Sequence, residues 1–328
     1  MSRLLIIGAS GFIGRFVTAT FASEDYTVRA AVRDPSTASH HDGVEVVQCA
    51  DFEQTAVDWR PLVEGVNTII HLAGLAHTRG GSDALYDRIN RRATAELVAA
   101  AAKAGVKRFV FVSSVRAQIG ASTDHVLIES DPALPTDAYG RSKLAAEASV
   151  RAAGIPFTIL RPVLVYGPGV KGNFSWLMRT ASTPMPLPVK SFTNRRSLLG
   201  INNLLSALRF VLASPATIGE TYLVADPGEA PTLAEIVAAL RRAKNRPPRL
   251  LPMPPRYIEI LLSVLQKHEL WEIIGGNLQV DPAKLIAAGW QPVHSSLVGL
   301  TMLAHDDASG VSSRFRSSMP PNTPTPKT

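Results

Sequence analysis

Short runs rich in apolar and β-branched residues alternate with helical patterns through the first half of the chain. The runs stand at residues 4–7, 28–32, 44–49, 68–72, 109–113 and 158–160. Strands with successive apolar positions are buried on both faces, which is typical of a parallel sheet covered by helices. The helical patterns between them stand at residues 15–22, 84–104 and 139–152. This order predicts an α/β fold with a doubly wound parallel sheet of Rossmann type.

A glycine-rich loop joins the first expected strand to the first expected helix. Its glycines allow a tight turn and let backbone N–H groups approach a pyrophosphate at the helix N-terminus. Such a loop can be an ordinary turn, but its position in a strand–helix–strand unit favours a dinucleotide. We therefore expect the cofactor to bind at Gly8, Ser10, Gly11, Phe12, Ile13 and Gly14.

The end of the second expected strand bears on the choice between NAD and NADP. A carboxylate there accepts a hydrogen bond from the ribose 2′-OH, whereas an arginine accommodates a 2′-phosphate. The chain has Arg33 followed by Asp34. Arg33 favours NADP, and Asp34 leaves NAD open. After the third expected strand, Asp51 and Phe52 are candidates for the adenine edge, with a simple loop as the alternative interpretation.

A tyrosine and a lysine four residues apart are the candidates for catalysis. Tyr139 and Lys143 share one helix face, and Ser113 and Ser114 end a buried strand before them. We expect the ammonium and a positive nicotinamide ring to lower the phenol pKa from about 10. Tyr139 then acts as general acid or base, Ser114 binds the substrate oxygen, and Lys143 also holds the cofactor ribose. A helical surface pair is the alternative, but the conjunction with the glycine loop favours an enzyme.

The composition of the chain changes after Gly167, where prolines become frequent. We expect a dinucleotide-binding domain at residues 1–167. A smaller, mostly helical substrate-binding lobe should follow at residues 168–304, partly interleaved with the last strands of the sheet. Residues 305–328 are rich in Ser, Thr and Pro and predict a disordered tail.

The formal net charge of +7 bears on the partners of the chain. Because no run of five or more Lys or Arg occurs, the charge favours an anionic small molecule over nucleic acid. The single cysteine, Cys49, excludes an internal disulfide. No apolar segment is long enough for a membrane span. His71 and His77 lack metal-ligand spacing. A cytoplasmic protein without a metal site is the expectation.

From Arg3 to about Leu303 the sequence resembles the extended short-chain dehydrogenase/reductase family of nucleotide-sugar epimerases, dehydratases and reductases. The glycine loop, the serine pair and the Tyr-x-x-x-Lys motif carry the resemblance. It implies a homodimer through the helices at 84–104 and 139–152. It also implies further cofactor contacts at Leu72, Ala73, Gly74, Asn90, Ser113, Pro162 and Val163.

The resemblance also implies where a nucleotide-linked sugar binds. Asn173 and Arg196 fall where family members contact the nucleotide diphosphate, and Ser114 and Arg116 complete the substrate contacts. An ion pair for Arg196 and a helix cap for Asn173 are the structural alternatives.

Within the family, residues 166–174 and 194–198 are most similar to the bacterial UDP-N-acetylquinovosamine 4-dehydrogenase group. The dehydratases of the family carry Thr-Asp-Glu where this chain has Ser114-Val115-Arg116, so water elimination lacks its acid and base. We expect reduction of a UDP-4-keto-6-deoxy-(N-acetyl)hexose at C4, for surface polysaccharide.

Three other functions remain open. A UDP-hexose 4-epimerase, interconverting UDP-glucose and UDP-galactose, needs the same residues. A reductase of ketones or aldehydes without a sugar is the second, because residues 28–34 resemble such enzymes. A non-catalytic NAD(P) sensor is the third, and the presence of both Tyr139 and Lys143 speaks against it.

Overall fold

The structure is a computed structural model that describes residues 2–37, 41–53, 57–76, 81–170, 172–266, 271 and 274–309. Its centre is a seven-stranded sheet whose neighbouring strands are all parallel. In sheet order the strands are β10 (Thr221–Val224), β7 (Phe157–Pro162), β5 (Arg108–Val112), β4 (Thr68–His71), β1 (Ser2–Ile7), β2 (Tyr26–Val32) and β3 (Val44–Gln48). The predicted doubly wound sheet is confirmed.

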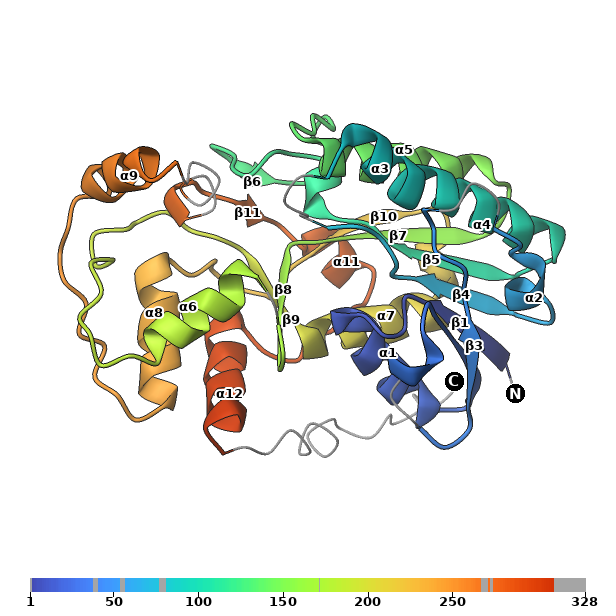
Figure 1. The fold of residues 1–328 in the computed structure, drawn as a ribbon, viewed down its shortest axis with the longest axis horizontal. Coiled ribbons are helices and arrows are strands. Elements are labelled where there is room, and N and C mark those ends of the chain that lie inside the picture. Colours follow the sequence, from blue (N-terminus) through green and yellow to red (C-terminus); the bar gives the residue numbers. More distant parts are fainter. Residues whose placement is uncertain are drawn as a thin grey trace.

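Helices cover both faces of this sheet (Figure 1). One layer contains α1 (Phe12–Ala22) and α7 (Ile201–Ala213), and the other contains α2 (Arg60–Val63), α4 (Ala93–Lys103) and α5 (Ala138–Ala152). Because successive strand residues point to opposite faces, β1 contributes to both cores. Leu4 and Ile6 pack in the core with α1 and α7, whereas Leu5 and Ile7 pack in the core with α4 and α5.

The helix predicted at residues 84–104 is interrupted. The segment consists of α3 (Asp83–Tyr86), the π-helical turns η2 (Asp87–Arg92) and α4. Asp87 forms ion pairs with Arg91 and Arg92 along these turns. The wider turns place Asn90 in the interior, with 1% of its surface exposed. Stretches of π-helix occur often at functional sites.

A smaller lobe lies beside the sheet (Figure 1). Its helices are α6 (Asn173–Ala181), α8 (Leu233–Ala243), α9 (Pro255–Val264) and α12 (Ser296–Ser309). Phe174, Ile236 and Leu300 of α6, α8 and α12 belong to one separate core. The start of α8 is secured by a capping box between Thr232 and Glu235.

The chain crosses between lobe and sheet more than once. β10 returns to the sheet from within the segment expected to form the lobe. The remaining elements of the described chain are η1 (Pro35–Thr37), η3 (Val115–Ala117), β6 (Val126–Leu127), β8 (Leu164–Tyr166), β9 (Leu198–Gly200), η4 (Pro215–Thr217), β11 (Gln279–Val280) and α11 (Ala283–Ala287). β6 pairs with β11 and β8 with β9.

The last helix extends past the expected boundary at residue 304. α12 ends at Ser309, and the rest of the expected tail, 310–328, lies outside the described residues, as does His77. No helix in the described part of the chain has the length and apolarity that crossing a bilayer requires.

Candidate active site

The glycine loop leaves β1 where the strand order reverses. β1 pairs with β2 on one side and with β4 on the other, and ligands of such sheets bind in the crevice at this point. Gly8 has a φ of +88°, and a Cβ on it would lie 2.8 Å from the backbone nitrogen of Ala73. A Cβ on Gly14 would lie 2.1 Å from the carbonyl oxygen of Gly8. Only glycine fits these two positions.

The same loop exposes the N-terminus of α1. Gly11 is the residue that caps this helix, and among the described residues no side chain caps the first turn. Ser10 and Gly11 are exposed, while Phe12 and Ile13 are half-buried. Free N–H groups and the helix dipole together favour an anion. The residues present therefore fit the pyrophosphate of a dinucleotide.

The residues after β2 and β3 lie side by side at the edge of this crevice. Arg33 is largely exposed, and its Nη1 lies 3.9 Å from Oδ2 of Asp51. Oδ1 of Asp34 accepts hydrogen bonds from the N–H and the hydroxyl of Ser36 at 3.0 and 2.7 Å. Phe52 packs against Trp59 with 9% of its surface exposed. Arg33 is thus exposed and pairs with Asp51 at this distance, whereas Asp34 is engaged in its own turn.

Ser114, Tyr139 and Lys143 converge at the carboxyl end of β5. Tyr139 forms a hydrogen bond with Ser114, and both residues are 9% exposed. One helical turn later, Nζ of Lys143 donates to the carbonyl oxygen of Val112 at 3.2 Å. The same ammonium lies 4.7 Å from the ring centroid of Phe111. The three side chains therefore form one buried cluster.

Burial dominates the protonation of this cluster. It raises the pKa of Tyr139, while the hydrogen bond with Ser114 and the charge of Arg116 act in the opposite direction. We expected the ammonium of Lys143 and a nicotinamide ring together to lower this pKa; in the protein without cofactor, burial outweighs the groups that lower it. Burial also lowers the pKa of Lys143 to about 8, against the opposing effect of Glu147.

Glu147 is a buried acid next to the candidate site that the sequence interpretation missed. Its side chain is fully buried and lies one turn beyond Lys143 on α5. It accepts hydrogen bonds from Ser113 at 2.7 Å and from Arg161 at 2.6 and 2.9 Å. The spacing Tyr-x-x-x-Lys-x-x-x-Glu was the signal that could have found it.

Two of the expected cofactor contacts are occupied by structural bonds. The hydroxyl of Ser113 donates to Glu147, and its N–H donates to the carbonyl oxygen of Leu160 at 2.8 Å. Asn90 bonds to both backbone groups of Leu75 and donates to Oγ of Ser142 at 2.9 Å. Their side chains therefore hold the loop after β4 and the helix α5 in place.

The other expected cofactor residues lie at the carboxyl ends of β4 and β7. The N–H groups of Leu72 and Ala73 both donate to the carbonyl oxygen of Ile7 at 3.0 Å. A Cβ on Gly74 would lie 3.1 Å from Nζ of Lys143, so the backbone there adjoins the buried cluster. Pro162 and Val163 are buried at the carboxyl end of β7, next to β5.

Two arginines lie close together on the lobe side of the cluster. Arg116 forms an ion pair with Asp137, which caps α5 through its other oxygen. Arg196 donates to the carbonyl oxygens of Gly276 and Ala121 at 3.0 and 3.1 Å. Burial and the neighbouring charge of Arg116 lower the pKa of Arg196 to about 10. No carboxylate of the described chain pairs with Arg196, so this pair of cations suits an anion.

Asn173 is the first residue of α6. Its side chain lies outside what the structure describes. Among the described residues, no group of three or more His, Cys, Asp or Glu side chains is placed to hold a metal ion.

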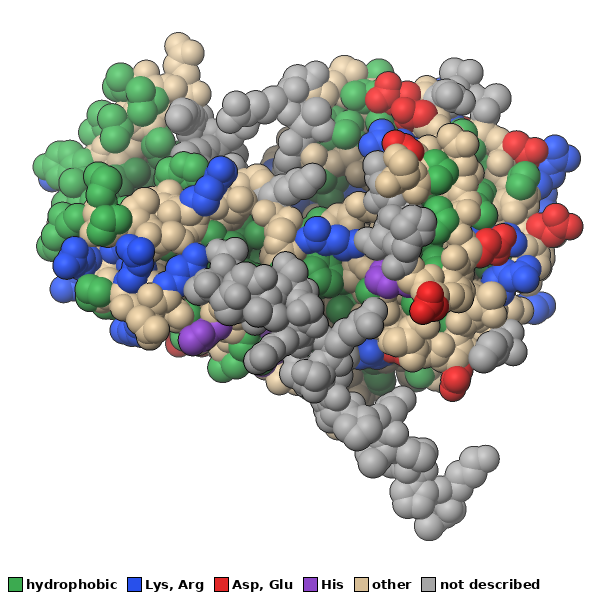
Figure 2. Space-filling view, turned by 60° about the horizontal axis from the view of Figure 1, so that its bottom comes forward, with side chains coloured by type: hydrophobic (Ala, Val, Ile, Leu, Met, Phe, Trp, Pro, Cys, Tyr) green, Lys and Arg blue, Asp and Glu red, His purple; other side chains and the backbone are tan. Residues whose placement is uncertain are grey.

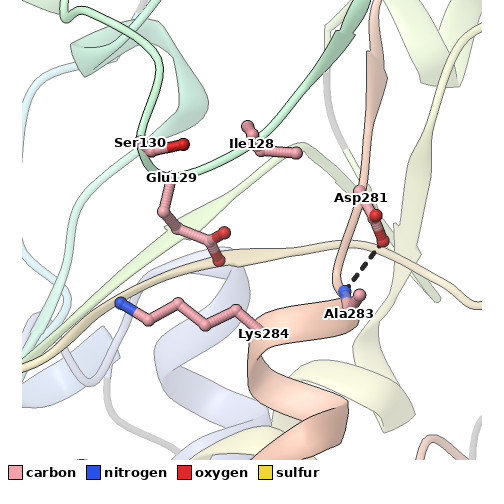
Figure 3. Close-up of a pocket in the computed structure, with 6 residues that line it drawn as sticks. All are labelled: Ile128, Glu129, Ser130, Asp281, Ala283 and Lys284. Carbon is pink, nitrogen blue, oxygen red and sulfur yellow. Dashed lines mark hydrogen bonds between the residues drawn. The ribbon is translucent and has the colours of Figure 1, made fainter.

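A pocket of about 410 Å³ lies elsewhere, between the loop after β6 and α11. In Figure 3 the side chain of Glu129 points down toward that of Lys284, whose ammonium extends past the carboxylate. Glu129 accepts the N–H of Leu223 at 2.8 Å, and Lys284 donates to the carbonyl oxygen of Thr221 at 3.1 Å. Both partners belong to β10, the edge strand of the sheet. The two side chains satisfy an exposed edge, and we assign them this structural role.

Comparison with known proteins shows the family to which the sequence is similar. The sequence model of the NAD dependent epimerase/dehydratase family matches residues 4–225. The UDP-glucose 4-epimerase of Vibrio cholerae is 32% identical over 313 residues, which cover 92% of this chain and 94% of that protein. The ceramide reductase of Caulobacter vibrioides is 31% identical over 251 residues, covering 76% and 73%.

A solved structure has the same fold. The UDP-glucuronic acid 4-epimerase from Bacillus cereus in complex with NAD superposes with a TM-score of 0.72 at 20% identity. The match covers 93% of this chain and 98% of that one.

Proposed function

The chain belongs to the NAD dependent epimerase/dehydratase family, and we propose that it reduces the C4 carbonyl of a UDP-4-keto-6-deoxy-(N-acetyl)hexose. The observation that carries the proposal is the buried cluster of Ser114, Tyr139 and Lys143 beside the glycine loop. NADPH, which Arg33 favours, supplies the hydride when bound. The protein supplies the proton and holds the sugar carbonyl in position for the hydride.

Tyr139 is suited to donate that proton. Because burial raises its pKa, the phenol holds its proton at neutral pH. A carbonyl oxygen placed between Ser114 and Tyr139 accepts hydrogen bonds from both, and the phenol proton moves to it as the alkoxide forms. Arg116 and the Ser114 hydrogen bond both favour the phenolate that remains. Lys143 lies beside Gly74, and its role in the proposal is to bind the cofactor ribose.

The two arginines support a substrate with a diphosphate. Arg196 is half-buried and bonded only to carbonyl oxygens among the described residues. A diphosphate would supply the charged oxygen acceptors that these carbonyl groups do not. The backbone at the start of α6, where Asn173 lies, is proposed as the second contact.

The 4-epimerase is the second candidate, because the Vibrio cholerae relative that carries that name matches nearly the whole chain. An epimerase removes a hydride from C4 and returns it to the other face, so it needs no net cofactor. A reductase consumes one cofactor molecule for each sugar.

This difference in cofactor consumption can be measured. Purified protein would be mixed with NADPH, or with NADH, and a UDP-4-keto-6-deoxy amino sugar, while nicotinamide absorbance is followed. Stoichiometric consumption supports the reductase. Interconversion of UDP-glucose and UDP-galactose without consumption would replace it by the epimerase.

One relative is named a ceramide reductase, so reduction of a ketone or aldehyde without a sugar should be tested as well. That alternative has no diphosphate for Arg196 to bind.

We further propose a cytoplasmic homodimer packed through α4 and α5 that acts in surface polysaccharide synthesis, as the family resemblance implies.

A further inference from the structure

Helix α9 turns an apolar face toward solvent. Leu262 is the one residue of this helix that is buried. Five large apolar side chains of the helix and the residue after it are each more than half exposed, namely Tyr257, Ile260, Leu261, Val264 and Leu265. Their spacing puts all of them on one side of the helix, and we call this side the α9 face. In a surface helix such a stripe normally packs on the core, so its exposure indicates a partner.

The α9 face lies at one end of the molecule. In Figure 1, α9 stands at the far end of the lobe from the sheet. Figure 2 shows apolar side chains gathered at that end of the molecule, with Lys and Arg side chains along their border. Leu251, just before the helix, is also half exposed. The patch is thus peripheral and does not adjoin the catalytic cluster.

The segment around α9 carries a strongly positive charge. Residues 236–266 contain one acid, Glu259, which falls outside the α9 face. The basic residues of the same segment are Arg241, Arg242, Lys244, Arg246, Arg249 and Arg256. Four of these, Arg242, Arg246, Arg249 and Arg256, are exposed.

The exposed apolar face and the positive charge together indicate which kind of partner binds α9. A symmetric contact between two copies would place the same patch against itself and bring the two sets of cations together. An anionic bilayer complements both properties, because its headgroups attract the cations and its acyl chains accept the apolar face. A helix of ten residues suits the plane of the interface, since it is too short to cross.

We propose that α9 docks this protein on an anionic lipid bilayer. The α9 face inserts among the upper acyl chains, and the exposed arginines of residues 242–256 lie at the headgroup phosphates. Neither feature belongs to the site around Tyr139, so docking and turnover are separable.

The test uses the full chain and vesicles. Sedimentation with vesicles of phosphatidylglycerol and phosphatidylcholine should carry the protein down, and vesicles of phosphatidylcholine alone should bind about tenfold or more weakly. The double variant Ile260→Glu/Val264→Glu should lower partitioning into the anionic vesicles about tenfold or more.

A matched control separates insertion from added charge. Leu297→Glu/Val298→Glu adds the same two negative charges at exposed apolar positions of α12. This control should keep most of the binding. Circular dichroism and thermal midpoint identify a variant that fails to fold, and Arg249→Gln/Arg256→Gln then tests the same surface through its charge.

Three results would overturn the proposal. They are absence of wild-type binding to the anionic vesicles, equal binding by the α9 variant and the wild type, and dissociation of a larger oligomer by the α9 variant in light scattering. The last result would assign the face to a second copy of this chain.

Discussion

Replacing Lys143 by methionine should change how the stability of the folded protein depends on pH. Lys143 is 4% exposed, and burial lowers its pKa from 10.5 to about 8, although Glu147 opposes this. The folded protein therefore binds this proton more weakly than the unfolded chain does. Below about pH 8 the charged lysine destabilises the fold, and the penalty is relieved as the pH rises from 8 toward 10.5.

The size of the effect follows from the shift. A change from 10.5 to about 8 corresponds to about 3 kcal/mol at pH 7, since one unit is worth about 1.4 kcal/mol. By pH 9.5 about 2 kcal/mol of this penalty has disappeared. The variant carries no such proton. The free energy of unfolding of the wild type, measured relative to the variant, should therefore rise by about 2 kcal/mol between pH 7 and pH 9.5.

Urea unfolding at the two pH values, followed by circular dichroism, measures this difference. Taking the variant as reference cancels the titration of all other groups. The hydrogen bond to Val112 and the contact with Phe111 are lost at both pH values alike. Lys103→Met, at an exposed position of α4, is the control, because its ammonium remains in water. An unchanged difference between wild type and Lys143→Met would refute the reasoning, whatever happens to turnover.

Three further variants test the proposed site. Tyr139→Phe should lower turnover by about 10²-fold or more because the proton donor is lost, with cofactor affinity by calorimetry nearly unchanged; an active variant would contradict the role. Gly14→Ala should weaken cofactor binding in the same assay, because its Cβ would meet the carbonyl oxygen of Gly8 at 2.1 Å; normal affinity would remove the loop from the site. Arg196→Ala should raise the KM for a UDP-sugar about tenfold or more without a matching fall in kcat. An unaltered KM would favour a substrate without a diphosphate.

Local patterns in the sequence were reliable for the sheet and for the shared helix face of Tyr139 and Lys143. Burial on both faces of the strands follows from their apolar runs, and the shared face of Tyr139 and Lys143 follows from a four-residue spacing. The helix expected at residues 84–104 was less accurate, because its composition does not reveal the π-helical turns that bury Asn90.

Electrostatics and side-chain direction were decided by the packed structure. The pKa of Tyr139 is raised because burial outweighs its neighbours, and no spacing rule measures burial. Ser113 adjoins Ser114 in the sequence, yet its hydroxyl donates to Glu147 in the core. Which of the two serines bonds to Glu147 depends on how α5 packs against β5.

Local sequence patterns specify the order of strands and helices, the glycine loop and the one-turn spacing of Tyr139 and Lys143. Each of these depends on residues that are near one another along the chain. The packing of the whole molecule sets Arg196 beside Arg116 and leaves the apolar side of α9 uncovered. Such relations join or separate segments that are distant in sequence, so they depend on how whole elements pack and which surfaces that packing leaves open to solvent.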